Sequence, residues 1–329
     1  MSKRKLSHQQ TRRIAKKQQQ RSDQSSVDSD KLQAGTVLTR YSKQADVEAE
    51  DGTVWRCHLR ANLGDVVSGD KVVWAPHDDE SGVIESVNPA KNKLERPDSY
   101  GKMRAVASNI DQMLITIAIA PEPHAGLIDR YLVVAENLEI EAVLVINKTD
   151  LIQKPQREFM DKLREKYKKL GYLSLDVCAK DGHGLDELKR ALAGKTSIFA
   201  GQSGVGKSSL IQVLLPDEPI KIGELSEQVA KGRHTTTHSR LYHFPDGGDC
   251  IDSPGIREFG LWHFAEHEVL KGFIELRELA GTCKFRDCRH LQEPGCAIIA
   301  AHQQGTICNE RFDSFRRITH SLDEVDVKR

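Results

Sequence analysis

One eight-residue segment constrains the fold of this chain more than any other. Residues 201–208 read Gly-Gln-Ser-Gly-Val-Gly-Lys-Ser, which fits the pattern G-x-x-x-x-G-K-S without a mismatch. An apolar run precedes it at Thr196–Ala200, and a helical run follows at Ser208–Leu215. A glycine-rich turn between a strand and a helix is the usual setting of a phosphate-binding loop. An ordinary glycine-rich turn is the alternative, but the flanking pattern favours the phosphate loop.

The loop is expected to bind the phosphates of a nucleotide. The glycines let the backbone wrap a phosphate, and successive N–H groups supply positive potential. Lys207 is predicted to reach the β- and γ-phosphates and to assist catalysis, and the Ser208 hydroxyl is predicted to ligate Mg²⁺, which prefers oxygen ligands. The predicted contacts are Gly201, Gln202, Ser203, Gly204, Val205, Gly206, Lys207, Ser208 and Ser209.

An aspartate at the end of a later apolar strand extends this site. Asp252 begins the sequence Asp-Ser-Pro-Gly, about 45 residues after the phosphate loop. Its carboxylate suits an indirect, water-mediated contact with Mg²⁺, and the N–H of Gly255 is expected near the γ-phosphate. Alone this sequence predicts only a turn, but after a phosphate loop it supports a nucleotide site.

Another motif predicts which base is bound. The apolar run Ala142–Ile146 leads into Asn147-Lys148-Thr149-Asp150, an N-K-x-D motif at the carboxyl edge of a predicted parallel strand. Asp150 can accept hydrogen bonds from two N–H donors of guanine that adenine lacks, which favours GTP over ATP. Asn147 is expected to bridge to the phosphate loop, and Lys148 to cover the base. Cys178-Ala179-Lys180 resembles the S-A-K loop that contacts guanine through backbone N–H groups, with cysteine in place of serine.

The loop Lys231–His238 contains three adjacent threonines between the two phosphate motifs. One of them is expected to close over Mg²⁺ and the γ-phosphate; Thr236 is favoured and Thr235 is the next choice, and a solvated loop is the alternative. Ile256 stands where many GTPases carry a glutamine that orients the attacking water. Isoleucine cannot polarise water, so His234 is the candidate for that task, unless it is a loop histidine without a role. Slow intrinsic hydrolysis that a partner accelerates is therefore expected.

The order of the motifs is permuted. In ordinary small GTPases the phosphate loop comes first and the base-reading motifs last, whereas here residues 147–150 and 178–180 precede residues 201–208. The same sheet can still form, because the termini of a domain are often close together. The Asp-Ser-Pro-Gly segment then leads directly into a Cys/His-rich region, so a movement of this segment can pull on that region.

Patterns along the chain predict three folded parts. Short β-rich runs between turn signals in residues 33–95 indicate a small barrel, with an OB-fold as the candidate. Alternating strands and helices follow and predict a parallel sheet. After residue 260 the pattern is helical. We predict a basic disordered arm at 1–32, an OB-fold domain at 33–96, a permuted α/β P-loop GTPase domain at 97–260 and a helical zinc-binding domain at 261–329.

Four of the seven cysteines lie after residue 282. Cys283, Cys288, His290 and Cys296 place three thiols and one imidazole within 14 residues, which is the ligand set of one closed, structural Zn²⁺ site. Disulfides are the alternative, which a reducing compartment disfavours. Cys308 is a spare thiol. The remaining cysteines are expected to be packing residues: Cys57, Cys178 and Cys250.

Charge suggests a polyanion partner. Lys+Arg and Asp+Glu both number 48, yet residues 1–21 carry eight basic side chains and no acidic one. Basic arms and OB-folds commonly bind nucleic acid, although a barrel of this kind can also bind protein. The chain shows neither an apolar run long enough for a membrane span nor a secretory signal, which predicts a cytoplasmic protein. No oligomerisation seam is visible, so a monomer is expected.

Taken together, these motifs resemble a known family over nearly the whole chain. The arm, the barrel, the permuted order N-K-T-D, G-Q-S-G-V-G-K-S, D-S-P-G and the spacing C-x₄-C-x-H-x₅-C resemble the RsgA (YjeQ) family of bacterial small-ribosomal-subunit biogenesis GTPases. The resemblance implies late maturation of the 30S subunit, binding to 16S rRNA near the decoding region, and GTP hydrolysis that 30S stimulates and that triggers release. It also implies that His234 positions the water.

Two other functions stay open at the level of sequence. One is an RNA scaffold that holds GTP without hydrolysing it, which the missing glutamine allows. The other is a GTPase that acts on a different RNA or protein. Hydrolysis measured with and without 30S subunits would separate the three.

Overall fold

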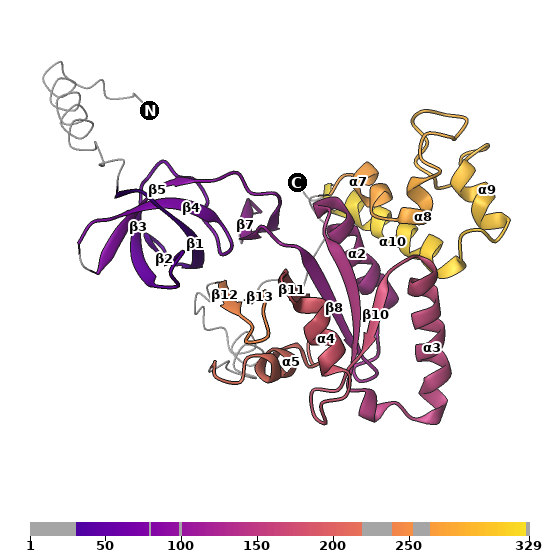
Figure 1. The fold of residues 1–329 in the computed structure, drawn as a ribbon. Helices are drawn as coiled ribbons and strands as arrows, with labels where there is room; N and C mark the ends of the chain where they lie inside the picture. The colour runs from indigo at the N-terminus through magenta and orange to yellow at the C-terminus, as the bar shows by residue number, and fades with distance from the viewer. Residues whose placement is uncertain (1–30, 79, 99–100, 219–238, 253–263, 327–329) are drawn as a thin grey trace, which may run out of the picture.

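The computed structural model of the protein describes residues 31–326 apart from 79, 99–100, 219–238 and 253–263 (Figure 1). The predicted contributions of His234, Thr236, Gly255 and Ile256 lie outside the described residues, as does nearly all of the basic arm. Within the described part of the chain, none of the helices has the length and apolar character needed to span a bilayer.

The N-terminal part is a closed five-stranded barrel, as the sequence predicted. Its strands pair in the order β1-β2-β3-β5-β4, and β4 pairs back onto β1. Alternate residues of β2 point inward, and the interior is filled by apolar side chains such as Val47, Trp74 and Ile84. The strands are β1 Gln33–Arg40, β2 Gln44–Ala49, β3 Val54–Leu59, β4 Lys71–Pro76 and β5 Ser81–Val87.

The central part is a six-stranded sheet in the order β10-β9-β8-β11-β13-β12, in which β12 alone runs antiparallel to its neighbour β13. Every residue of β8 is buried, because helices cover both faces of a parallel sheet. The strands are β8 Gln112–Ala118, β9 Glu141–Asn147, β10 Leu173–Asp176, β11 Thr196–Ala200, β12 Arg240–His243 and β13 Asp249–Asp252.

Helices from different parts of the chain cover the two faces. α2 (Ala125–Leu138) and α3 (Lys154–Lys169) share one apolar core with the C-terminal helices. α4 (Leu185–Leu192) and α5 (Lys207–Leu214) form a second core on the other face. A short 3₁₀ helix, η2 (Thr149–Leu151), follows β9.

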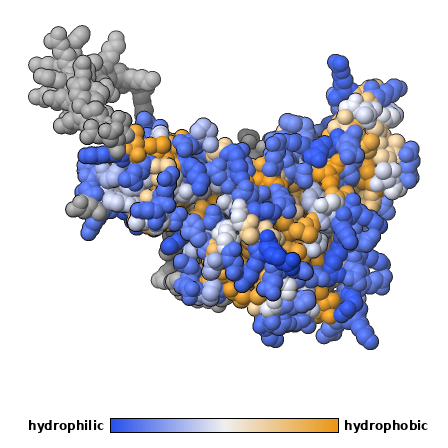
Figure 2. Space-filling model, viewed as in Figure 1, coloured by the Kyte–Doolittle hydropathy of each residue, from blue (hydrophilic) through white to orange (hydrophobic). Residues whose placement is uncertain are grey.

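The C-terminal part is helical, as predicted, and its longest helix lies beside α2 (Figure 1). The sequence pattern predicted a helical part after residue 260 but did not single out the last helix. The helices are α7 Glu266–Lys271, α8 Ile274–Arg277, α9 Ala297–Gln303 and α10 Asn309–Asp326. Polar residues cover most of the face shown in Figure 2, and apolar residues show on it mainly over the central sheet region and the C-terminal helices.

Two features join the barrel to the central sheet. β6 (Lys93–Pro97) and β7 (Met103–Ser108) form a separate two-stranded hairpin between them, which crosses the predicted domain boundary at residue 96. In addition, Thr39 of β1 pairs with Arg240 of β12, so the barrel and the central sheet form one continuous set of eleven strands.

Candidate functional site

The predicted phosphate loop and the predicted base-reading motif meet at one edge of the central sheet. β9 ends at Asn147 and β11 ends at Ala200, directly before the loop. Both strands pair in parallel with β8, so their carboxyl ends lie at the same edge. In open α/β sheets this edge is where ligands bind.

The phosphate loop requires glycine at two positions because other backbone and side-chain atoms approach it closely. Gly206 has φ of 93°, and a Cβ there would lie 2.3 Å from Asn147 Nδ2. Gly201 has φ of 137°, and a Cβ there would lie 2.1 Å from the carbonyl oxygen of Thr116. The glycines therefore let the loop fold tightly against the ends of β8 and β9.

Lys207 and Ser208, which end the phosphate loop, lie at the start of α5. The Lys207 ammonium donates to the carbonyl oxygens of Gly201 and Gln202, at 2.6 and 2.7 Å, so it curls back over the loop. Ser208 follows in the first turn of α5 and is half-buried. An ammonium and a hydroxyl thus lie on adjacent residues at the start of the helix.

Asn147 ties the two motifs together. Its Nδ2 donates to the carbonyl oxygen of Val205 at 2.9 Å, and its Oδ1 accepts from the N–H of Ala179 at 3.3 Å. The side chain is 1% exposed. One buried amide thus links the phosphate loop, the end of β9 and the Cys178-Ala179-Lys180 loop, and this is the bridge that the sequence predicted for it.

Lys148 fastens the same corner. Its Nζ donates to the carbonyl oxygens of Gly204 and Ala120, at 2.6 and 3.0 Å. The residue has φ of 58°, a left-handed conformation that turns the chain into η2. The neighbouring Thr149 hydroxyl donates to the carbonyl oxygen of Val177 at 3.2 Å, which holds η2 against the following strand.

Asp150 presents a carboxylate that its neighbours orient. The Cys178 thiol donates to Asp150 Oδ1 at 3.3 Å, and Lys180 Nζ lies 3.9 Å from Oδ2. The Asp150 side chain is 25% exposed, so part of the carboxylate stays open to a ligand. Cys178 was expected only to pack; it is buried and also contacts Asp150. Its place in the C-A-K motif was the signal that could have shown this.

Asp252 lies at the same edge of the sheet. β13 runs parallel to β11 with Ile251 level with Ile198, so Asp252, the last residue of β13, lies level with the end of β11. The side chain is half-buried. The structure thus brings together the predicted residues at 147–150, 178–180, 201–209 and 252.

A second candidate site lies in the C-terminal helical part. Cys283, Cys288, His290 and Cys296 each place one ligand atom within 4.8 Å of the others. The Sγ atoms of Cys283 and Cys296 are 3.9 Å apart, and each lies 3.4–3.5 Å from His290 Nδ1. Two sulfurs on a tetrahedral zinc are about 3.8 Å apart, as follows from Zn–S bonds of about 2.3 Å. The cluster therefore has the dimensions of a four-coordinate metal site.

The chemistry of the cluster agrees with its geometry. All cysteines are free thiols, so no described pair forms a disulfide. Burial lowers the pKa of His290, which favours the neutral imidazole that binds metals. Cys308 is exposed and lies outside the cluster, as expected of a spare thiol.

These features define a P-loop GTPase fold in which the strand with the N-K-T-D motif precedes the strand with the phosphate loop. The family model described as RsgA GTPase matches residues 87–262. The small ribosomal subunit biogenesis GTPase RsgA of Saccharophagus degradans is 54% identical, covering 100% of both chains, and that of Hahella chejuensis is 48% identical, covering 99% of both. The chain belongs to the RsgA GTPase family.

Solved structures agree with this placement. YjeQ from Thermotoga maritima superposes with a TM-score of 0.74 at 33% identity, covering 88% of this chain and 98% of that chain. YloQ, described as a circularly permuted GTPase, superposes with a TM-score of 0.71 at 26% identity, covering 89% and 96%. The permuted GTPase fold predicted from the motif order is confirmed.

Proposed function

We propose that this protein is a GTP hydrolase that acts in the late maturation of the small ribosomal subunit. The proposal that GTP is the nucleotide rests on the buried Asn147 side chain, which bridges the phosphate loop and the base-reading loops. The subunit comes from the names of the relatives, each called a small ribosomal subunit biogenesis GTPase.

In the proposed complex, each end of GTP meets its own set of residues. Asp150 accepts the two guanine donors, which adenine cannot supply; the stem of Lys148 covers the base, and backbone N–H groups of the Cys178-Ala179-Lys180 loop contact it. The backbone of residues 201–206 surrounds the phosphates, and Lys207 moves from its loop carbonyls to the β- and γ-phosphates. The exchange is favourable because the phosphates carry more charge than two carbonyl dipoles.

The residues at the sheet edge also fit Mg²⁺. Ser208 in the first turn of α5 supplies a hydroxyl and Asp252 at the end of β13 supplies a carboxylate, and both are the hard oxygen ligands that Mg²⁺ prefers. When bound, Mg²⁺ would neutralise charge on the β- and γ-phosphates. Thr236 is proposed as its further ligand and Gly255 as a γ-phosphate contact.

We assign the positioning of the attacking water to His234, since Ile256 cannot replace the usual glutamine. The measurement is GTP turnover of His234→Ala with and without 30S subunits. Loss of 30S-stimulated turnover with unchanged GDP binding is expected. Unchanged stimulation would remove His234 from this role.

The Cys/His cluster is proposed to hold one structural Zn²⁺. Three thiolates and one imidazole suit Zn²⁺, and four protein ligands leave no position for a reacting water. The metal would cross-link the loop that joins α8 to α9, since all four ligands lie within residues 283–296.

The partner is tested by GTP hydrolysis with and without purified 30S subunits. The proposal places the protein in the cytoplasm as a monomer that binds 16S rRNA near the decoding region, hydrolyses GTP slowly alone and leaves the subunit after hydrolysis. Hydrolysis that 30S does not accelerate would indicate a GTPase with another RNA or protein partner. Tight GTP binding without hydrolysis under any condition would indicate a scaffold.

A further inference from the structure

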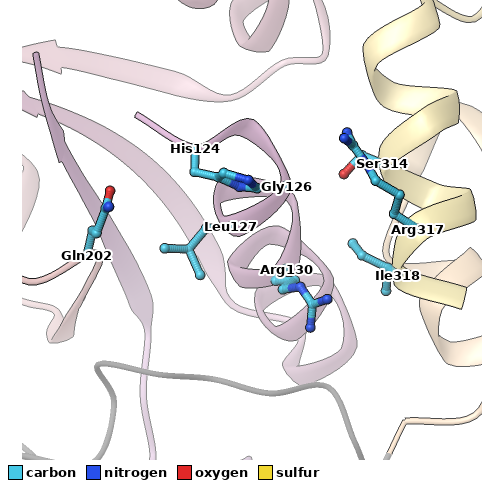
Figure 3. Close-up of a pocket in the computed structure, with 8 residues that line it drawn as sticks. All are labelled: His124, Gly126, Leu127, Arg130, Gln202, Ser314, Arg317 and Ile318. Atoms are coloured by element: carbon cyan, nitrogen blue, oxygen red, sulfur yellow. The ribbon is translucent and has the colours of Figure 1, made fainter. Parts of the chain in front are cut away.

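A cavity of about 370 Å³ lies between the start of α2 and α10 (Figure 3). Its lining includes Arg130 of α2, and Ser314, Arg317 and Ile318 of α10. Gln202 of the phosphate loop reaches its far wall. The cavity thus lies between the predicted phosphate-binding loop and the longest C-terminal helix.

The charged side chains around the cavity lack acidic partners. Among the residues that the structure describes, neither Arg130 nor Arg317 pairs with a carboxylate; Arg130 contacts only the Ser321 hydroxyl, at 3.3 Å. Burial lowers the pKa of Arg130 from its ordinary value, because no nearby anion compensates for the lost water. His124 adds a third basic group at the start of α2. Arg130 extends from α2 toward α10, and Arg317 extends from α10 toward the start of α2 (Figure 3).

The start of α2 is itself suited to an anion. His124 at the N-cap makes no capping hydrogen bond, and the first turn holds no acidic residue. The N–H groups of Leu127 and Ile128 donate to the carbonyl oxygen of His124, which leaves the N–H groups of Ala125 and Gly126 and the helix dipole to favour a negative charge. Gly126 in this turn lines the cavity and leaves the backbone accessible.

An independent observation comes from the opposite wall. Ser314 is 0% exposed, and its Oγ has no hydrogen-bond partner among the described residues. It faces the helix start, because a Cβ placed on Gly126 would lie 3.9 Å from Ser314 Oγ. A buried hydroxyl without a partner is unfavourable, and a ligand oxygen in the cavity would satisfy it.

We propose that this cavity is a second phosphate site, separate from the phosphate loop, for a phosphate ester. Two guanidinium groups, a helix start and a hydroxyl approach from different directions, which suits a tetrahedral oxyanion with several acceptor oxygens better than a planar carboxylate. Leu127 and Ile318 give the cavity apolar walls for the organic part of the ester. The phosphate comes from a free nucleotide or from an RNA backbone.

The test uses the full chain saturated with GDP and Mg²⁺, so that the phosphate loop is filled. Inorganic phosphate and AMP are titrated by calorimetry, and a labelled single-stranded RNA hexamer by fluorescence anisotropy. Arg317→Gln is expected to weaken binding at least about tenfold, since it removes a charge-assisted contact. The matched control is Arg316→Gln, because Arg316 precedes Arg317 on α10, is exposed as Arg317 is, and does not line the cavity.

A second variant, Gly126→Ala, tests the same cavity in case Arg317→Gln weakens binding only by destabilising the fold. The added methyl group would lie 3.1 Å from His124 Cε1 and narrow the cavity, whereas alanine favours the helix more than glycine does. Weakening by both variants but not by Arg316→Gln supports the site. Binding of AMP or phosphate then indicates a free ester, and binding of RNA alone indicates a backbone phosphate. If the variants weaken the binding of none of the probes, the proposed site is refuted. An unchanged affinity for GDP in the variants then shows that the proposed GTPase function does not depend on this site.

Discussion

The guanidinium of Arg311 determines how firmly the C-terminal helices attach to the GTPase domain. Its side chain is 1% exposed, and Nη1 lies 2.6 Å from Asp129 Oδ1 on α2. Its Nε and Nη2 donate to the two carboxylate oxygens of Glu275 on α8, at 2.6 and 3.0 Å. Burial alone would lower the pKa of Arg311, but Asp129 and Glu275 raise it above its ordinary value, so the group stays charged.

We predict that Arg311→Met destabilises this attachment by about 3–5 kcal/mol, because removing one member of a buried ion pair leaves the Asp129 carboxylate buried without a counter-charge, with only the Tyr167 hydroxyl donating to it. Asp129 makes the cost high, since it is 1% exposed and its Oδ2 has no partner among the described residues. Methionine keeps an apolar stem, so lost packing adds little. For a unit of 150–250 residues this corresponds to a fall in Tm of roughly 6–20 °C.

The control is Arg277→Met, which removes an exposed ion pair at the same interface. Arg277 Nη1 lies 3.1 Å from Glu136 Oε2, and the two side chains are 46% and 21% exposed. Such a pair contributes about 1 kcal/mol or less. Urea unfolding gives the two free energies, and hydrogen exchange shows whether α8 and α10 open first. A loss for Arg311→Met no larger than that for Arg277→Met would refute the role of the buried network.

Three further predictions concern the sites and the sheet. Asp150→Asn should weaken the binding of GTP at least about tenfold, because an amide N–H₂ would face the guanine donors. Displacement of a fluorescent GDP analogue measures this affinity, and an unchanged affinity would show that Asp150 does not recognise the base. Cys296→Ser should lower bound zinc well below one ion per chain by metal analysis, and full occupancy would argue against the cluster. Burial tends to raise the pKa of Asp111, but hydrogen bonds from Lys91 and the Thr196 N–H outweigh it and leave the pKa lowered. The free energy of unfolding of the wild type should therefore exceed that of Asp111→Asn by its largest amount above about pH 4, and this difference should shrink at lower pH. Urea titrations at several pH values would show this, and a difference that does not change with pH would contradict it.

The nucleotide loops could be predicted from the sequence because each is a local motif. Residues 201–208 and 147–150 carry their glycines, lysines and acids within a few positions, and strand pairing only has to bring two short segments together. The same holds for the Cys/His cluster, whose four members lie within 14 residues. In each of these segments, sequence spacing and spatial arrangement coincide.

Other features depend on contacts that no local pattern contains. α10 carries Phe312, Phe315, Ile318 and Leu322 at helical spacing, a signal that was available but was obscured by the many charged residues between them. Arg311 lies in the same helix, and its burial follows from partners on α2 and α8 that are far away in the sequence. The β6–β7 hairpin was missed for a related reason: its strands are only five and six residues long, β6 is mostly charged, and β6 ends in proline.

The permuted order has a physical consequence at both ends of the GTPase domain. At one end, Ser68 of the barrel donates to the carbonyl oxygen of Ser239 at 2.7 Å, and Thr39 pairs with Arg240. Ser239 directly follows the segment that holds the predicted threonine loop. At the other end, the helices after residue 263 pack on α2, whose first turn lies near the phosphate loop across the cavity lined by Gln202. A force on the barrel or on the C-terminal helices therefore acts on chain next to the predicted γ-phosphate contacts.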